Sequence, residues 1–271
     1  MKLCVLGSGS RGNAVLIQSR DTRVLIDAGF SPRGMLRRLS SIGVDPQSIE
    51  ALIVTHEHCD HSRGAMAASE RWGWNVYATA GTHVNCQSLT ESASITIRSG
   101  TDFAIGDIRM SVVQTSHDAS EPVALVATSS ATGVRAGVVY DLGSVTQTVR
   151  DALDRIDILV IESNHDSAML RDGPYPPSLK RRIAGRQGHL SNRDAGRLTA
   201  ECAHRGLSHV VLAHLSETNN TPRIATESMR FALRPTPFRG SVVAASQNSP
   251  SPPIGAERAA AFGPAQLSLG L

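Results

Sequence analysis

Cysteine is scarce in this sequence, and long apolar runs are missing. The chain has four cysteines and no Cys-x-x-Cys pair, which argues against a disulfide framework or a zinc ribbon and favours a reducing compartment. No stretch approaches the roughly 18 consecutive apolar residues of a membrane-spanning helix, and the apolar run at the N-terminus is too short for a signal peptide. These absences predict a cytoplasmic protein with no membrane partner.

A strong excess of charge is also missing. The net charge is +3, from 27 Lys and Arg against 24 Asp and Glu, so only a local cluster of basic residues would indicate nucleic-acid binding. Hydrophobic residues make up 41% of the 271 residues, enough for a sizeable core. We expect one α/β domain over residues 1–240 and a flexible tail, rich in Pro, Ser and Ala, over residues 241–271.

Short apolar strands alternate with amphipathic segments, the rhythm of an α/β fold. A helix is expected to begin at Pro32 behind the N-cap Ser31 and to stop at Gly43, and others are expected over Val145–Leu153 and Ser191–His204. The expected strands are Lys2–Leu6, Ala14–Gln18, Val24–Ile26, Ala51–Val54, Asn75–Ala78, Ile108–Gln114, Val123–Thr128, Val134–Tyr140, Ile156–Ile161 and Val210–Ala213.

The strongest chemical signal is the motif His56-x-His58-x-Asp60-His61, which directly follows a strand. A bend after that strand can turn the first two histidines toward one metal ion, and Asp60 and His61 toward a second about 3.5–4 Å away. The alternative is a chance cluster of surface histidines. Further candidate ligands also stand at strand ends and favour the metal interpretation: His117, Asp141 and His214.

The order of these motifs resembles the metallo-β-lactamase superfamily over about residues 1–220. The resemblance implies an αβ/βα four-layer sandwich, in which two mixed β-sheets are flanked by helices. It also implies two divalent metal ions, zinc or manganese, one bound by His56, His58 and His117 and the other by Asp60, His61 and His214. Asp141 would bridge the two ions, and Asp27 would brace the histidine loop.

A second set of motifs resembles the YycJ/WalJ-type family, which is related to the ribonuclease Z branch. It comprises Gly7-Ser8-Gly9-Ser10-Arg11-Gly12-Asn13, Ser163-Asn164-His165-Asp166 and Gly188-His189-Leu190-Ser191-Asn192. This resemblance implies a metal-dependent 5′ to 3′ DNA exonuclease linked to mismatch repair. The expected substrate contacts are Ser8, Ser10, Asn13, Asn164, His165, Lys180, Arg181, Ser191 and Asn192.

Two catalytic roles follow from the resemblance. Asp60 would orient or deprotonate the attacking water, and His189 would contact the phosphate or protonate the leaving oxygen; alternatively, His189 only caps a helix. Basic residues near this motif would attract a phosphate backbone, although an ordinary solvated helix face would look the same. The basic residues are Lys180, Arg181, Arg182, Arg186, Arg193 and Arg197.

The last six residues resemble the peptide with which bacterial repair proteins bind the sliding clamp, which would make Gln266, Leu267, Leu269 and Leu271 partner-binding residues. The alternative is a featureless apolar end. Two other function classes stay open. One is a small-molecule hydrolase, such as a cyclic phosphodiesterase, thioesterase or lactonase, and the other is a non-catalytic binding module that has kept the fold.

Overall fold

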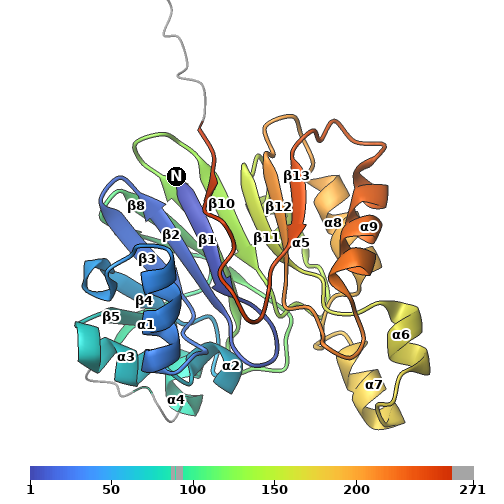
Figure 1. The fold of residues 1–271 in the computed structure, drawn as a ribbon, viewed down its shortest axis with the longest axis horizontal. Helices are drawn as coiled ribbons and strands as arrows, with labels where there is room; N and C mark the ends of the chain where they lie inside the picture. Colours follow the sequence, from blue (N-terminus) through green and yellow to red (C-terminus); the bar gives the residue numbers. More distant parts are fainter. Residues whose placement is uncertain (87–88, 90–93, 258–271) are drawn as a thin grey trace, which may run out of the picture.

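The structure is a computed structural model that describes residues 1–86, 89 and 94–257. Two seven-stranded mixed sheets pack face to face, and helices cover both outer faces (Figure 1). The prediction of a four-layer sandwich is therefore confirmed. In the described part of the chain, no helix is long and apolar enough to cross a membrane.

Each sheet combines an antiparallel part with a parallel part. In the first sheet, order β14-β1-β2-β3-β4-β5-β6, pairing is antiparallel from β14 to β3 and parallel from β3 to β6. Its strands are β1 (Lys2–Gly7), β2 (Ala14–Ser19), β3 (Thr22–Ile26), β4 (Ala51–Ile53), β5 (Asn75–Thr79), β6 (Ser94–Ile97) and β14 (Ile254–Gly255).

The second sheet repeats this plan in the order β13-β12-β11-β10-β9-β8-β7. Pairing is antiparallel from β7 to β10 and parallel from β10 to β13. Its strands are β7 (Asp102–Ile105), β8 (Ile108–Gln114), β9 (Val123–Ser129), β10 (Arg135–Val139), β11 (Ile158–Glu162), β12 (His209–Ala213) and β13 (Ser241–Ala244).

Most strands carry apolar side chains on both faces. One face packs against the other sheet and the opposite face packs against helices. In β1, Leu3 and Val5 belong to the core between the sheets, whereas Cys4 and Leu6 belong to the core under the helices. Successive side chains of a strand point to opposite faces, so an unbroken apolar run is what a strand covered on both sides requires.

Helices fill the outer layers and the strand ends. The first sheet is covered by α1 (Pro32–Ser41) and α3 (Ala65–Trp72), and the second by α5 (Gln147–Ala152), α8 (Asn192–Glu201) and α9 (Pro222–Leu233). Helix α4 (Ala80–Asn85) directly follows β5. The short α2 (Cys59–Ser62) carries the second half of the histidine motif, and the 3-10 turn Pro46–Ser48 precedes β4. Helices α6 (Ser167–Asp172) and α7 (Pro177–Ile183) extend away from the sheets (Figure 1).

The beginning of α1 matches its sequence prediction. The Ser31 hydroxyl accepts a hydrogen bond from Gly34 N at 3.3 Å, and Met35 and Leu39 are fully buried. The helix expected over Ser191–His204 is shorter, since α8 ends at Glu201.

The expected tail boundary at residue 240 is corrected by the structure. Residues 241–257 belong to the domain: β13 pairs with β12 and β14 pairs with β1, and Val242 and Ile254 are buried. The edge of a sheet offers unpaired backbone N–H and C=O groups. Segments of only four and two residues can therefore pair there as strands, even next to residues rich in Pro and Ser. Residues 258–271, including the expected clamp-binding residues Gln266, Leu267, Leu269 and Leu271, lie outside the described residues.

Candidate metal centre

The candidate metal ligands lie on loops that follow strands. The loops after β4, β8, β10 and β12 carry, in that order, the motif from His56 to His61, then His117, Asp141 and His214. Asp27, Asp141 and His214 take left-handed backbone conformations, with φ of 60°, 55° and 53°. Such conformations cost roughly 1–3 kcal/mol each in non-glycine residues. Three of them at one site indicate that the fold holds these side chains in place for a function.

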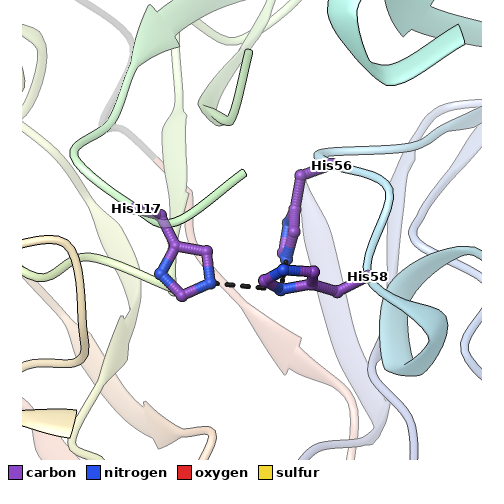
Figure 2. A group of neighbouring side chains, drawn as sticks. All are labelled: His56, His58 and His117. Carbon is purple, nitrogen blue, oxygen red and sulfur yellow. Dashed lines mark hydrogen bonds between the residues drawn. The ribbon is translucent and has the colours of Figure 1, made fainter. Parts of the chain in front are cut away.

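His56, His58 and His117 form the first group, here called the imidazole cluster (Figure 2). His58 Nδ1 lies 3.1 Å from His56 Nε2 and 3.2 Å from His117 Nε2. His56 and His117 are only 1% and 3% exposed. One ring nitrogen from each of the three histidines therefore lies close enough to the other two to contact the same ion.

Hydrogen bonds behind the imidazole cluster fix which nitrogens carry protons. His117 Nδ1 lies 3.0 Å from the carbonyl oxygen of Gly188, which only accepts, so His117 Nε2 is left unprotonated. The Thr55 hydroxyl donates to Asp27 and therefore accepts from His56 Nδ1, at 3.1 Å. His56 Nε2 is then also an electron-pair donor, the state in which imidazole binds zinc or manganese.

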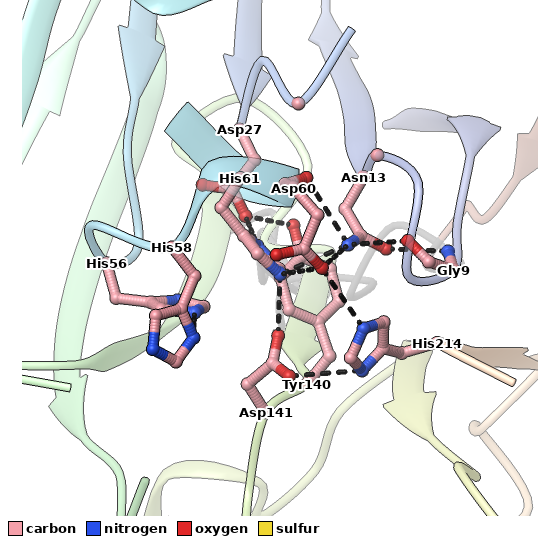
Figure 3. Close-up of polar contacts among 12 residues, drawn as sticks. Gly9, Asn13, Asp27, His56, His58, Asp60, His61, Tyr140, Asp141 and His214 are labelled. Atoms are coloured by element: carbon pink, nitrogen blue, oxygen red, sulfur yellow. Dashed lines mark hydrogen bonds and ion pairs between the residues drawn. The ribbon is translucent and has the colours of Figure 1, made fainter. Parts of the chain in front are cut away.

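Asp60, His61 and His214 form the second group, here called the carboxylate cluster, and Asp141 lies beside it (Figure 3). His61 Nε2 lies 2.8 Å from Asp141 Oδ2 and 3.4 Å from Asp60 Oδ2, and His214 Nε2 lies 3.3 Å from Asp60 Oδ2. Asp141 Oδ1 is also 3.9 Å from His117 Nε2. Asp141 thus stands between the two clusters, where a bridging ligand would be needed.

Two buried atoms, one of Asp141 and one of His214, indicate that the site fits a cation. Asp141 Oδ2 and His214 Nε2 are buried and make no hydrogen bond of good geometry among the described residues, although each lies near an oppositely charged group, His61 and Asp60. A buried polar atom without a well-formed hydrogen bond is costly. Both atoms belong to ligand types that zinc and manganese accept. A divalent ion among these side chains would satisfy them.

Asp27 braces both clusters from a fully buried position. Its carboxylate accepts hydrogen bonds from Thr55 N at 2.8 Å and Thr55 Oγ1 at 2.9 Å, lies 2.7 Å from His61 Nδ1, and accepts from the Tyr140 hydroxyl at 2.7 Å. These contacts tie Asp27 to the histidine loop on one side and to Tyr140 on the other. The sequence analysis did not single out Thr55 and Tyr140, although each directly precedes a candidate ligand.

His189 lies beside the carboxylate cluster and is paired with Glu162. His189 Nδ1 is 2.8 Å from Glu162 Oε1 and 3.2 Å from Asp141 Oδ1. Burial alone would lower the pKa of His189, but the charge of Glu162 and the hydrogen bonds to both carboxylates raise it to about 9. Burial opposes ionisation of Glu162 as well, yet His189 lowers the pKa of Glu162 to about 2.

Glu162 is a functional candidate that the sequence analysis missed. It is fully buried at the end of β11, lies 2.9 Å from His214 Nδ1, and accepts hydrogen bonds from Leu142 N and Leu190 N. The available signal was a carboxylate closing the apolar strand Ile158–Ile161. One buried side chain thus orients both His189 and His214.

Both clusters open into a cavity of about 270 Å³. Its lining includes one of the expected substrate contacts, the exposed Ser10. The other lining residues are His58, Asp60, His117, Asp118, Asp141, Tyr175, Leu179, Arg182, Ile183, Gly188, His189 and His214.

Several expected substrate contacts lie under the cavity and support its walls. Asn13 Nδ2 donates to Asp60 Oδ2 at 3.2 Å, the Ser8 hydroxyl accepts from His214 N at 2.8 Å, and Asn164 Nδ2 donates to the His214 carbonyl at 3.0 Å. All three are buried. The structure therefore gives them contacts to the ligand loops and does not place them on the cavity wall.

The remaining expected substrate contacts lie farther back or farther out. Ser191 caps α8, and Asn192 bonds to Ser163 and Asn220. His165 is 3% exposed, and its Nδ1 has no hydrogen-bond partner among the described residues. Lys180 donates to the carbonyl of Arg171, and Arg181 lines a neighbouring hollow.

The fold and this pair of clusters define a hydrolase of the β-lactamase superfamily. A family model described as "Beta-lactamase superfamily domain" matches residues 22–215. The chain belongs to this superfamily. Within it, the chain belongs to the family of the YycJ and WalJ exodeoxyribonucleases, because its similarity to these proteins covers most of its length.

The chain is 31% identical to exodeoxyribonuclease YycJ of Bacillus anthracis, over 86% of this chain and 89% of the relative. It is 29% identical to exodeoxyribonuclease WalJ of Streptococcus pneumoniae, over 84% of this chain and 86% of the relative. Among solved structures, the metallo-β-lactamase fold protein YhfI of Bacillus subtilis matches with a TM-score of 0.68 and 20% identity, covering 92% of this chain and 98% of that one.

Proposed function

We propose that this chain is a 5′ to 3′ exodeoxyribonuclease that acts on duplex DNA in repair with two divalent cations, zinc or manganese. The observation that carries the proposal is the convergence of the imidazole and carboxylate clusters on either side of Asp141, next to His189. The names of the relatives at 31% and 29% identity support DNA as the substrate.

Two bound cations would activate water and neutralise charge on the phosphate. Burial opposes ionisation of Asp60, but the charge of His61 holds the pKa of Asp60 well below its usual range. Its carboxylate, anchored by Asn13, therefore stays ionised and can hold a cation and orient the attacking water. His189 holds a proton because its pKa is raised to about 9. With Nδ1 bound to Glu162, His189 can donate that proton from Nε2 to the leaving oxygen.

Digestion of duplex DNA labelled at the 5′ or the 3′ end tests this proposal. The purified protein, loaded with manganese or zinc, is expected to release nucleotides from the 5′ end. Asp60→Asn should reduce the rate by about three orders of magnitude, which is several kcal/mol of lost transition-state stabilisation. A His209→Asn control changes a histidine at the start of β12, remote from the ligand loops, and should not change the rate.

The same assay separates the other function classes. Turnover of a thioester, a lactone or a cyclic phosphodiester without DNA digestion would show a small-molecule hydrolase. Purified protein that binds no divalent metal and turns over none of these substrates would be a binding module.

The clamp interaction stays part of the proposal. In a pull-down with a bacterial sliding clamp, the full chain should be retained. A variant that lacks residues 266–271, and with them Gln266 and Leu267, should not be retained. Retention of the truncated protein would show that residues 266–271 are not needed for clamp binding and would contradict this part of the proposal.

A further inference from the structure

A second hollow adjoins the metal cavity and shares Asp118, Arg182 and Gly188 with it. We call it the arginine groove. Its volume is about 590 Å³, larger than the metal cavity, and its other lining residues are Ser116, Arg181, Gly185, Arg186 and Gln187.

Backbone contacts fix the floor of the arginine groove against the loop of His117. Asp118 N donates to the Gln187 carbonyl at 3.0 Å, and the Ser116 hydroxyl donates to the Arg186 carbonyl at 2.8 Å. Gly143 packs so closely behind this loop that a Cβ there would lie 2.4 Å from Gly188 N. The groove therefore has a defined position relative to the imidazole cluster.

The charges of the groove favour an anion. Three arginines face one carboxylate, and Arg182 Nε is paired with Asp118 Oδ2 at 2.6 Å. Within the described residues, the side chains of Arg181 and Arg186 have no ion pair or hydrogen bond. A guanidinium group without a partner can bind a phosphate with two parallel hydrogen bonds.

Other members of the basic run do not face the groove. Lys180 donates to the Arg171 carbonyl, and Arg197 lies 4.0 Å from Asp194 on α8. Arg193 is exposed near the start of α8 and does not line the groove. The run is thus divided into a part beside the metal cavity and a part on a separate helix, which provides a matched control.

We propose that the arginine groove is a second phosphate subsite, which binds a backbone phosphate adjacent to the one that is cleaved. Arg182, oriented by Asp118 at the boundary of the two hollows, would contact the segment between these phosphates. The inference rests on the proposed nuclease function. It predicts that substrates with two or more consecutive phosphodiesters gain a contact that a single small diester lacks.

The test compares an oligonucleotide with bis(p-nitrophenyl) phosphate in the metal-loaded protein. In the double variant Arg181→Ala, Arg186→Ala, the ratio of kcat/KM for the oligonucleotide to that for the small diester should fall about tenfold. The slope of log kcat/KM for the oligonucleotide against log salt concentration should become shallower by about 1 for each lost contact. Arg181→Lys, Arg186→Lys should recover part of the loss, and Arg193→Ala, Arg197→Ala should change neither ratio nor slope.

Fluorescence anisotropy with a labelled oligonucleotide measures binding separately from cleavage. If wild type digests DNA but the double alanine variant keeps both the ratio and the salt slope, the second subsite is overturned while the nuclease proposal stands. If wild type does not cleave DNA, weaker oligonucleotide binding by the double variant would still support an anion subsite, and equal binding would overturn it. Equally tight binding of polyglutamate would overturn the assignment to phosphate.

Discussion

The imidazole and carboxylate clusters lie side by side, but the groups that contact their histidine rings from behind differ in charge. Behind the imidazole cluster stand a hydroxyl and a backbone carbonyl, from Thr55 and Gly188. Burial, the largest influence, lowers the pKa of His117, and burial together with the charge of His61 lowers the pKa of His56. Both rings are therefore neutral near pH 7 and can bind a cation without releasing a proton.

Behind the carboxylate cluster stand two buried acids, Asp27 and Glu162. Burial would lower the pKa of His61 and His214, but the nearby carboxylates, with Asp141 first among them, raise both well above the usual value. This cluster attracts positive charge, whether a proton or a metal ion. The comparison predicts that the carboxylate cluster would bind a cation more tightly than the imidazole cluster, but in competition with protons.

The largest expected effect comes from Asp141, which lies between the two clusters. Asp141→Asn should reduce DNA digestion by about three orders of magnitude or more, because several kcal/mol of charge stabilisation disappear. Elemental analysis should show weaker metal binding at both clusters. Asp60→Asn is the matched control and should impair only the carboxylate cluster. Loss of a single ion in Asp141→Asn would contradict the bridging position.

A smaller effect is expected from Asp27, which acts through its hydrogen bonds. Asp27→Asn should lower metal affinity at the carboxylate cluster by about 10–100-fold, the usual cost of losing a group that orients a ligand. Chelator competition measures this affinity. Tyr140→Phe removes only one bond to Asp27 and should weaken affinity less. Unchanged affinity in Asp27→Asn would show that His61 needs no brace.

The pairing of His189 with Glu162 predicts a pH dependence. Because the pKa of His189 is raised to about 9, the ring keeps its proton through neutral pH and loses it as the pH rises through about 9. In metal-free protein, Glu162→Gln should lower that pKa by about one unit or more, a tenfold change in proton affinity. NMR titration of the ring follows this change, with His209 as the internal control. Wild-type titration near pH 6.5 would contradict the pairing.

The smallest effect is expected at the neutral brace of the imidazole cluster. Thr55→Val removes the hydroxyl between Asp27 and His56 but keeps the size of the side chain. Metal affinity at the imidazole cluster should fall by less than about tenfold, because the lost hydrogen bond is worth about 1 kcal/mol. The same chelator competition measures it. If Thr55→Val lost as much metal affinity as Asp27→Asn, the proposed difference between a neutral brace and an acidic brace would be wrong.

Sequence patterns predicted the strands that carry the site because those strands are short, apolar and followed by polar motifs. The spacing of the motif from His56 to His61 predicts that its ligands divide between two metal ions. In the structure, His56 and His58 lie with His117, and Asp60 and His61 lie with His214, whereas the binding of two ions stays a prediction. Glu162 escaped notice because it has no motif of its own, and its contacts to His189 and His214 arise only when three loops meet in the fold.

For the expected substrate contacts, the sequence predicted the position in the chain but not the direction of the side chain. Ser8, Asn13 and Asn164 stand in polar motifs near strand ends, but the sequence does not reveal whether such a side chain faces the cavity or the loop beneath it. The strands β13 and β14 were missed for another reason: their few residues form strands only because the edges of existing sheets pair with them.

The most direct test is a crystal structure of the manganese- or zinc-loaded protein with anomalous scattering data. The account predicts two anomalous peaks about 3.5–4 Å apart, one contacted by His56, His58 and His117 and one by Asp60, His61 and His214, with Asp141 touching both. A single peak, or peaks elsewhere in the molecule, would contradict it.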